Sequence, residues 1–463
     1  MLARTAAQKM SDWLHSPRRK PLVLRGARQV GKSTLVRQFA AQQNRVLNEV
    51  NLERHLYLDK AFATLNPKTI LAELEVVSGR QIDAKRSLLF LDEVQATPHA
   101  LHALRYFFED YPNLPVVAAG SLLEFTLADH SFPMPVGRIQ YMYLGPLTFK
   151  EFLQGRQPEL VDYLARIEVE RKVPDSAHRE LSSRQREYLL VGGMPEAVDA
   201  CCEGSFQEVA HVHRSIAETY LDDFSKYARQ KDLLLLQRIF RFVPRNLGRK
   251  TKYVHISRDD RAATVRSAID LLVKARICYP VHHSACSGLP LLSDIKLNTY
   301  KLLFLDIGLA NHVCGMDWLS LNAMTEGQLV NEGGLAEQFI GQHLIEQTQY
   351  VGPPLLTYWL REGKGSNAEV DYVVSRGNWI VPIEVKSGKS GSLRSLHQFV
   401  LHKAPSLAVR FDANPPRLQR VSHLAKLGNN TCRVDYPLLS LPLYAVEELP
   451  RLVDHLRAKG PGI

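Results

Sequence analysis

The sequence PLVLRGARQVGKST, residues 21–34, decides how the rest of the chain is interpreted. Its apolar run at Leu22, Val23 and Leu24 is typical of a short buried strand. The eight residues GARQVGKS follow directly and have the spacing G-x-x-x-x-G-K-[ST]. Apolar residues at positions 35, 36 and 39 then recur at helical spacing. The stretch therefore predicts a strand, a glycine-rich loop and a helix that begins near Lys32.

This combination is the P-loop pattern, and its chemistry is phosphate binding. Its glycines let backbone N–H groups turn inward around phosphate oxygens, and the helix N-terminus adds the positive end of its dipole. We expect Lys32 to reach the β- and γ-phosphates and the Ser33 hydroxyl to ligate Mg²⁺. The alternative is a glycine turn that happens to carry Lys-Ser, and the flanking strand and helix argue against it. We therefore predict that ATP is bound by Gly26, Ala27, Arg28, Gln29, Val30, Gly31, Lys32, Ser33 and Thr34.

The composition is that of an ordinary globular protein. The 463 residues are 45% hydrophobic and 23% charged, and a chain of this length is expected to form about two to four domains. None of the six cysteines lies in a C-x-x-C pair, which fits a reducing, cytoplasmic location. The apolar runs are much shorter than the roughly 20 residues of a membrane span, and the N-terminus lacks the apolar core of a signal peptide. We therefore expect a cytoplasmic protein with no membrane partner.

The positive charge of the chain is concentrated in one segment. The net charge is +10, and residues 225–276 contain 14 Lys and Arg against 4 Asp and Glu. The excess in this segment equals that of the whole chain, so the segment is the expected contact for an anionic partner.

A second motif, SLLFLDE at residues 87–93, places two acids after an apolar run. This is the Walker B pattern, in which a buried parallel strand carries carboxylates to its C-terminal end beside the phosphates. We expect Asp92 to hold Mg²⁺ through water or Ser33, and Glu93 to act on the attacking water as general base. The alternative is ordinary helix capping by Asp-Glu. The P-loop upstream favours the catalytic interpretation.

Two further residues are candidates for the same nucleotide site. Ser121 follows an apolar strand at residues 115–119 and is predicted to sense the γ-phosphate or position water; the alternative is a turn serine. Arg138 is a candidate to stabilise charge that develops during phosphoryl transfer. It would act in its own subunit or on a neighbouring one, which makes a homo-oligomer an open alternative. The other interpretation of Arg138 is a surface arginine on a hairpin.

These motifs together resemble a family of bacterial and archaeal AAA-type ATPases that carry a C-terminal domain of uncharacterised function. The resemblance rests on the P-loop, on the box Asp92-Glu93-Val94-Gln95 and on three longer runs, which are GRIQYMYLGPLTFKEF at 137–152, GGMPE at 192–196 and KLLFLDIGL at 301–309. It covers nearly the whole chain. It implies ATP binding and a conformational role that depends on the nucleotide.

The middle of the chain is predicted to be mainly helical. Residues 151–224 read as a helical lid of the kind that transmits a nucleotide state. Helices at 233–247 and 261–274, followed by a β-rich stretch from residue 277, suggest a winged helix. In that case Arg261, Arg266 and Lys274 would face nucleic-acid phosphates. The alternatives are a protein-interaction module and a solvated basic helix.

Near the C-terminus, a predicted β-hairpin carries charges among apolar residues. Its strands are EVDYVV at 369–374 and WIVPIEVKS at 379–387. Alternate strand residues share a face, so Glu384 and Lys386 point the same way, and buried charges without partners are costly. The pattern D…E-x-K fits a site in which Asp371 and Glu384 bind Mg²⁺ or Mn²⁺ through their oxygens and Lys386 orients or deprotonates the attacking water.

This pattern resembles the core of the PD-(D/E)xK nuclease superfamily. The resemblance implies a further glutamate on a preceding helix, and Glu337 matches, with Glu332 as a nearby competitor. Gln398, on the following helix, is a further candidate for a residue of this site. The sequence departs from the pattern at Val370, which stands where the superfamily pattern has proline. One alternative is a surface hairpin in which the contact between Glu384 and Lys386 contributes little to stability. The other is a nuclease-like fold that binds a partner without cleaving it.

The predicted fold class is α/β, with four parts in order along the chain. They are an AAA-type ATPase core at 1–150, a helical lid or linker at 151–224, a winged-helix-like basic module at 225–299 and a nuclease-like domain at 300–463. The predicted function is Mg²⁺-dependent ATP hydrolysis coupled to the binding or processing of DNA. Its predicted catalytic residues are Glu93, Arg138 and Lys386, and its predicted metal ligands are Ser33, Asp92, Glu337, Asp371 and Glu384.

Two alternative functions stay open. One is a nucleotide-dependent switch whose C-terminal domain binds a protein or nucleic-acid partner without cleaving it. The other is a scaffold that binds ATP but hardly hydrolyses it, and Glu93 argues against this because a pure switch does not need the base. Residues 409–463 carry no motif.

Overall fold

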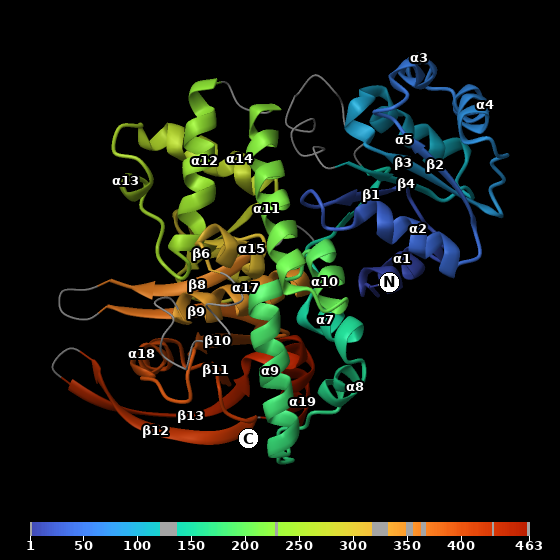
Figure 1. Ribbon diagram of the computed structural model, residues 1–463. Helices are drawn as coiled ribbons and strands as arrows, with labels where there is room; N and C mark the ends of the chain where they lie inside the picture. The colour runs from blue at the N-terminus through green and yellow to red at the C-terminus, as the bar shows by residue number, and fades with distance from the viewer. Residues whose placement is uncertain are drawn as a thin grey trace. The chain divides into compact units, whose positions relative to one another are not determined.

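The computed structural model describes residues 2–120, 137–226, 230–316, 332–348, 355–362, 367–427 and 430–460. Its contacts divide the chain into two compact units (Figure 1). The first comprises Met1–Pro146 and Lys274–Ile277, and the second comprises Leu147–Val273 and Cys278–Ile463. Among the described helices, none combines the length and the apolar character that a bilayer crossing requires.

The first unit is built on a parallel sheet of five strands in the order β2-β3-β4-β1-β5. The two central strands β3 and β4 are buried along their whole length, as expected for a parallel sheet covered on both faces. The strands are β1 (Leu22–Arg25), β2 (Val46–Asn51), β3 (Ser87–Asp92), β4 (Val116–Ala119) and β5 (Gln140–Tyr143).

Helices cover both faces of this sheet (Figure 1). One face carries α1 (Ala6–Leu14) and α2 (Lys32–Gln42), and the other carries α3 (Asp59–Ala63), α4 (Pro67–Ser78) and α5 (Pro98–Asp110). Leu89 and Leu91 of β3 pack into the core on the α4–α5 side. This is the mixed α/β fold with a P-loop that the sequence predicts for the first part of the chain.

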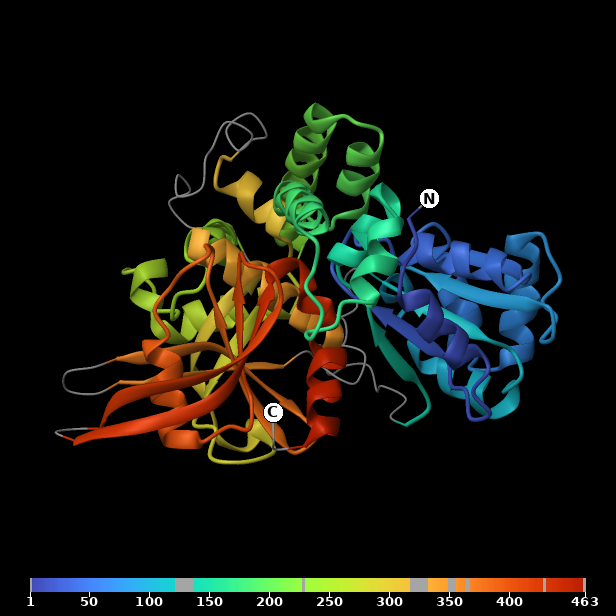
Figure 2. The ribbon, with the colours of Figure 1, turned by 90° about the horizontal axis from the view of Figure 1, so that it is seen from below.

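The second unit contains a mixed sheet of eight strands in the order β12-β13-β11-β10-β9-β8-β6-β7. Its β12–β13 pair forms a long antiparallel hairpin at one edge (Figure 2). The strands are β6 (Cys278–Ser284), β7 (Ile295–Phe304), β8 (Leu356–Arg361), β9 (Ala368–Arg376), β10 (Trp379–Val385), β11 (Ala408–Asp412), β12 (Arg417–Leu427) and β13 (Asn430–Pro442).

The strands β6 and β7 differ from the sequence-based expectation. We expected them to form the hairpin of a winged-helix-like module. They do pair with each other in antiparallel fashion, but β6 also pairs with β8, so both strands belong to the large sheet. The predicted hairpin of β9 and β10 is present, with Trp379 opposite Arg376. Residues 409–463, which carry no motif, supply β11, β12 and β13 and so complete the sheet.

Helices pack on both faces of the large sheet. The helix α18 (Arg394–Lys403) contributes Leu396 and Phe399 to a core with β9 and β13, and α17 (Glu332–Thr348) contacts β7, β8 and β10. The other helices are α7 (Phe149–Arg156), α8 (Glu159–Ala165), α9 (Asp175–Val191), α10 (Pro195–Cys202), α11 (Phe206–Asp223), α12 (Gln230–Arg245), α13 (Tyr253–Ile256), α14 (Ala262–Lys274), α15 (Ile307–Val313) and α19 (Leu449–Lys459).

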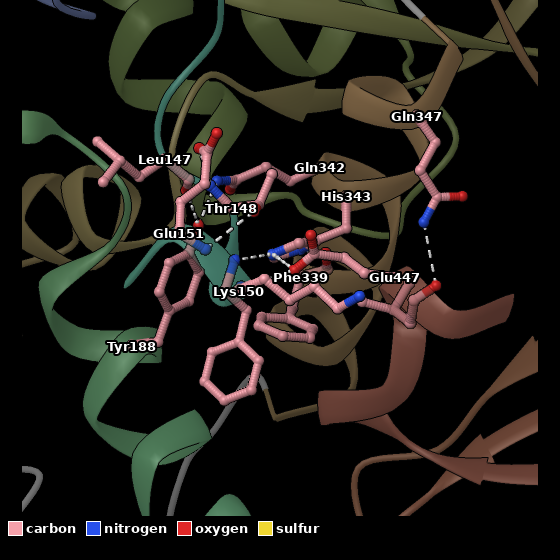
Figure 3. A network of polar contacts seen from close by, with 12 residues as sticks. Leu147, Thr148, Lys150, Glu151, Tyr188, Phe339, Gln342, His343, Gln347 and Glu447 are labelled. Carbon is pink, nitrogen blue, oxygen red and sulfur yellow. Dashed lines mark hydrogen bonds and ion pairs between the residues drawn. The ribbon is translucent and has the colours of Figure 1, made fainter. Parts of the chain in front are cut away.

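A buried polar network ties the start of α7 to α17 (Figure 3). The Phe149 N–H donates to His343 Nε2 over 2.8 Å, and His343 Nδ1 donates to the Phe339 carbonyl over 2.7 Å. Burial lowers the pKa of His343 to about 4, so the ring is neutral and each nitrogen has one defined role. The Lys150 N–H donates to Glu447 Oε1 over 2.8 Å. These bonds fix the position of α17 in the second unit.

Candidate functional sites

The backbone conformation of the P-loop depends on its glycines. Gly26 and Gly31 have φ angles of 151° and 87°, a region that side chains with a Cβ rarely adopt. A Cβ at Gly26 would lie 2.1 Å from the carbonyl oxygen of Leu144, so only glycine fits there. The helix α2 begins at Lys32, directly after the left-handed Gly31. The loop thus joins β1 to the N-terminus of α2, as the sequence predicts.

Lys32 is held inside this loop. Its ammonium donates to the carbonyl oxygens of Gly26, over 3.0 Å, and Ala27, over 2.8 Å. Burial lowers the pKa of Lys32 to about 8, although the carboxylates of Glu93 and Asp92 act in the opposite direction. The side chain is therefore placed at the loop, beside the two acids of the Walker B motif.

The Walker A serine and the Walker B aspartate are in direct contact. The Ser33 hydroxyl donates to Asp92 Oδ2 over 2.9 Å. Glu93 follows with a φ of 51°, an uncommon value for a residue other than glycine, and Gln95 Nε2 donates to Glu93 Oε2 over 2.6 Å. A hydroxyl and two carboxylates thus meet at the carboxyl edge of the parallel sheet, where such folds bind ligands.

The two other candidates for the nucleotide site do not join this group. Ser121 lies outside the described residues. Arg138 lies just before β5, and Gln140 of β5 is paired in parallel with Leu22, the first residue of β1. Its Nε is 3.2 Å from Glu109 Oε1. The P-loop follows the other end of β1, about 13 Å away along four strand residues, so Arg138 faces the edge of the sheet opposite to the P-loop.

Two arginines near the P-loop edge were not singled out by the sequence. Arg25 ends β1, and its Nη1 donates to the Tyr143 hydroxyl over 3.2 Å. The Arg276 guanidinium lies 4.5 Å from the centroid of the same ring, a cation–π contact. Arg276 belongs to the short segment that clusters with the first unit. In the sequence, Arg276 is part of the basic segment at residues 225–276. Only the fold shows that the chain returns to the first unit at this point.

A β-bulge lies at the second predicted site. Thr357 and Trp359 of β8 are two positions apart, but their partners on β9, Val373 and Val370, are three apart. Asp371 and Tyr372 therefore lie opposite a single residue of β8. Bulges of this kind change the direction of side chains and are common beside functional sites. Tyr372 donates its hydroxyl hydrogen to the Glu337 carbonyl oxygen over 2.8 Å, which ties β9 to α17.

Lys301 of β7 lies at the centre of the second site, although it belongs to none of the motifs that predict this site. Its Nζ is 3.1 Å from Glu337 Oε2 and 3.8 Å from Asp371 Oδ1, and it also forms an ion pair with Glu369. Only 3% of Lys301 is exposed. Burial alone lowers the pKa of Lys301, but the three carboxylates raise it well above its ordinary value, so the side chain is a cation.

The E-x-K pair lies beside this cluster. Lys386 Nζ donates to Glu384 Oε1 over 2.6 Å, and Asp371 Oδ2 accepts the Val385 N–H over 2.7 Å. Among the residues that the structure describes, the buried Glu384 Oε2 has no hydrogen-bond partner. Burial raises the pKa of Glu384 to about 8, with the nearby Asp371 as a second cause.

The acids of this cluster outnumber its cations. The carboxyl groups of Glu337, Glu369, Asp371 and Glu384 face the two ammonium groups of Lys301 and Lys386. Burial, with the nearby Asp371 as a second cause, raises the pKa of Glu337 and of Glu384 to about 8, so both are largely protonated at neutral pH while no cation is bound. Within the described ranges, no three acid, histidine or cysteine side chains are already arranged to hold a metal ion. The lysines lie between the acids that the sequence predicts as ligands, so these acids are near one another but paired with ammonium groups.

The remaining candidates near this cluster take other positions. Gln398 accepts a hydrogen bond from Arg361 Nη1 over 2.8 Å. The side chain of Glu332 lies outside the described part of the chain. In α14, Arg266 donates to Asn298 Oδ1 over 2.9 Å and is exposed.

Replacing Lys301 by methionine is expected to destabilise the second unit. A cation would be removed from among three carboxylates, and an uncompensated buried charge typically costs about 3–5 kcal/mol. The matched control is Lys296→Met on the exposed part of the same strand. Urea denaturation followed by circular dichroism measures both variants. Equal midpoints for the two variants would show that Lys301 is not the counter-ion of the cluster.

Comparison with known proteins finds a domain model that matches most of the first unit. Residues 18–153 match the model of an AAA domain. Residues 182–320 and 332–427 match two models described as domains of unknown function, DUF8612 and DUF4143. No curated protein matches the chain.

Forty chains of solved structures also match, and one example is similar over 75% of this chain. It is a Signal Transduction ATPase with Numerous Domains (STAND) protein with a tetratricopeptide repeat sensor, from Pyrococcus horikoshii. The match has 14% identity and a TM-score of 0.25, and covers 75% of this chain and 46% of that one. The present chain thus corresponds to less than half the length of that protein. By its AAA-domain match and its P-loop geometry, the first unit is a nucleotide-binding ATPase domain of the P-loop AAA type.

Proposed function

We propose that the protein hydrolyses ATP with Mg²⁺ and uses the nucleotide cycle to act on DNA through the carboxylate–lysine cluster of its second unit. The observation that carries the proposal is the convergence of Glu337, Asp371 and Glu384 from a helix and two strands onto one buried site. These are the positions that the resemblance to PD-(D/E)xK nucleases implies, and Lys386 lies beside them.

In the first unit, we assign the phosphates of ATP to the P-loop backbone and to Lys32, whose ammonium now holds two loop carbonyls. Ser33 and Asp92 would hold Mg²⁺, which shields the negative charge of the phosphates when it is bound. Glu93 would orient the attacking water and accept its proton. Gln95 would position Glu93 through the hydrogen bond that joins the two side chains.

The second site has the donor chemistry for a divalent cation. All of its acids offer carboxylate oxygens, the ligands that Mg²⁺ and Mn²⁺ prefer. Four carboxyl groups face two ammonium groups, so one divalent cation would replace the protons that the raised pKa values of Glu337 and Glu384 keep bound. The unpaired, buried Glu384 Oε2 offers one free donor. Glu337, Asp371 and Glu384 would hold the ion, which would supply electrophilic activation of a phosphodiester. Lys386 would orient the attacking water.

A second candidate function is a nucleotide-dependent binding module that does not cleave. One observation favours it: Lys301 already pairs with three of the four carboxylates and takes up part of their charge. In that case the cluster would be a structural ion network, and ATP would change the affinity for a partner.

A manganese titration separates the two functions without any activity assay. Electron paramagnetic resonance measures free Mn²⁺ as it is added to the wild type, to Glu384→Gln and to Ser33→Ala, all without nucleotide. The proposed function predicts one site that Glu384→Gln loses and Ser33→Ala keeps. If the wild type and Glu384→Gln bind Mn²⁺ equally, the cluster holds no metal and the binding module is the better account.

A further inference from the structure

Two adjoining hollows in the second unit have several basic side chains in their linings. The first has a volume of about 390 Å³ and the second about 370 Å³, and they share Phe242 and His255. Their linings include six Lys or Arg side chains and one acid, Glu369. The six are Arg238, Arg241, Arg245, Arg249, Lys250 and Lys252. We call the two hollows together the basic groove.

The arginines of the basic groove form a row on one helix face. Arg238, Arg241 and Arg245 lie three and four positions apart on α12, so their side chains follow one another along the same side of the helix. All three are exposed. Within the described part of the chain, neither Arg241 nor Arg245 has a carboxylate at ion-pair distance. Like charges held in a row without acidic partners are suited to a ligand that carries regularly repeated negative charges.

The other end of the basic groove borders the carboxylate–lysine cluster. The loop that carries Arg249 and Lys252 is fixed beside β7, because the Thr251 N–H donates to the Tyr300 carbonyl over 2.9 Å. Gly248 of this loop lies against Glu337, since a Cβ there would be 2.8 Å from Glu337 Oε1. Glu369, which pairs with Lys301, lines the second hollow. The basic groove therefore leads to the acids of the cluster.

We infer that the basic groove binds the phosphodiester backbone of a nucleic acid and leads it to the carboxylate–lysine cluster. This inference rests on the proposed function for the choice of ligand and adds the residues that hold it. The contacts are expected to be made with phosphates and to carry no base sequence, because arginine and lysine side chains supply them. It also moves the expected nucleic-acid contact from Arg261, Arg266 and Lys274 to the row on α12 and the loop after it.

The test is a binding measurement on a variant that lacks three of these charges. Arg241→Ala/Arg245→Ala/Arg249→Ala is compared with Arg171→Ala/Lys172→Ala/Arg179→Ala, in which three exposed cations of the same unit are removed. Fluorescence anisotropy follows labelled single-stranded DNA, duplex DNA and RNA from about 50 to 200 mM salt. We expect the groove variant to bind at least about tenfold more weakly and its salt dependence to fall by about one log–log unit per lost contact. The three probes identify which backbone is preferred.

Two outcomes would overturn the inference. One is equal affinity of the groove variant and the control variant for every probe. The other is a wild type that binds none of the nucleic acids but binds polyglutamate, which would assign the groove to an acidic protein. The measurement is independent of cleavage, because it is made with EDTA and without a divalent cation. If only the groove variant loses binding, the result supports nucleic-acid binding by the basic groove, even if neither the wild type nor any variant cleaves.

Discussion

Replacing Glu93 by glutamine is expected to lower ATP turnover at least about 100-fold while ATP still binds, because a general base typically contributes a factor of this size or more. Glutamine has the shape of glutamate but cannot accept the proton of the attacking water. Glu93 is held at the tip of β3 in a left-handed conformation, with Gln95 bonded to its carboxylate, so the substitution changes chemistry more than position. Phosphate release measures turnover, and a fluorescent ATP analogue measures binding.

The matched control is Glu109→Gln, because Glu109 is an acid of the same unit at the end of α5 and pairs with Arg138. Its turnover is expected to stay close to that of the wild type if Arg138 has no role within its own subunit. Unchanged turnover in Glu93→Gln would show that Glu93 is not the base. A fall in Glu109→Gln that grows with protein concentration would instead point to Arg138 acting on a neighbouring copy.

Replacing Asp371 by asparagine is expected to abolish metal-dependent cleavage of nucleic acid and to leave ATP turnover unchanged. Asp371 lies at the bulge of β9, bonded to the Val385 N–H and 3.8 Å from Lys301. Asparagine keeps one oxygen for the backbone bond but loses the charge that holds a divalent cation. A loss of at least about 100-fold is expected from removing a ligand of a catalytic metal.

Asp435→Asn is the matched control, since Asp435 is an acid of the same sheet that pairs with Arg420 at the exposed hairpin. Cleavage products separated on a denaturing gel measure both variants, beside phosphate release from ATP. Cleavage that survives in Asp371→Asn would remove the cluster from the mechanism. A parallel loss of ATP turnover would show that the substitution acts through the fold.

The sequence predicted the local fold of the P-loop well because the pattern lies in one continuous stretch. Strand, loop and helix follow one another in 21 consecutive residues, from Leu22 to Gln42, and Ser33 meets Asp92 because the parallel strands β1 and β3 end at one edge of the sheet. Arg138 shows where such reasoning stops. Arg138 precedes the first residue of β5, so its distance from the P-loop depends on the direction in which β5 runs beside β1. The parallel pairing of these two strands places Arg138 away from the P-loop, and the sequence does not show this pairing.

The second site was predicted only in part for the same reason. The hairpin of β9 and β10 and the glutamate of α17 are visible as patterns. Lys301, however, comes from β7 and lies 36 positions before Glu337, with which it forms an ion pair. The one available signal was a lysine at the head of an apolar run, KLLFLDIGL, because a lysine is rarely fully buried unless it is paired. The bulge at Asp371 has no signature in the sequence and depends on the partner strand β8.

The central claim is that ATP hydrolysis in the first unit and a metal site in the second act together on nucleic acid. The most direct test is cleavage of single-stranded, duplex and branched DNA with Mg²⁺ or Mn²⁺, with and without ATP, by the wild type, Asp371→Asn and Lys32→Ala. We predict metal-dependent cleavage that is lost in Asp371→Asn and altered in its response to ATP in Lys32→Ala. Absence of cleavage with every substrate and metal, while ATP turnover is intact, would contradict the account.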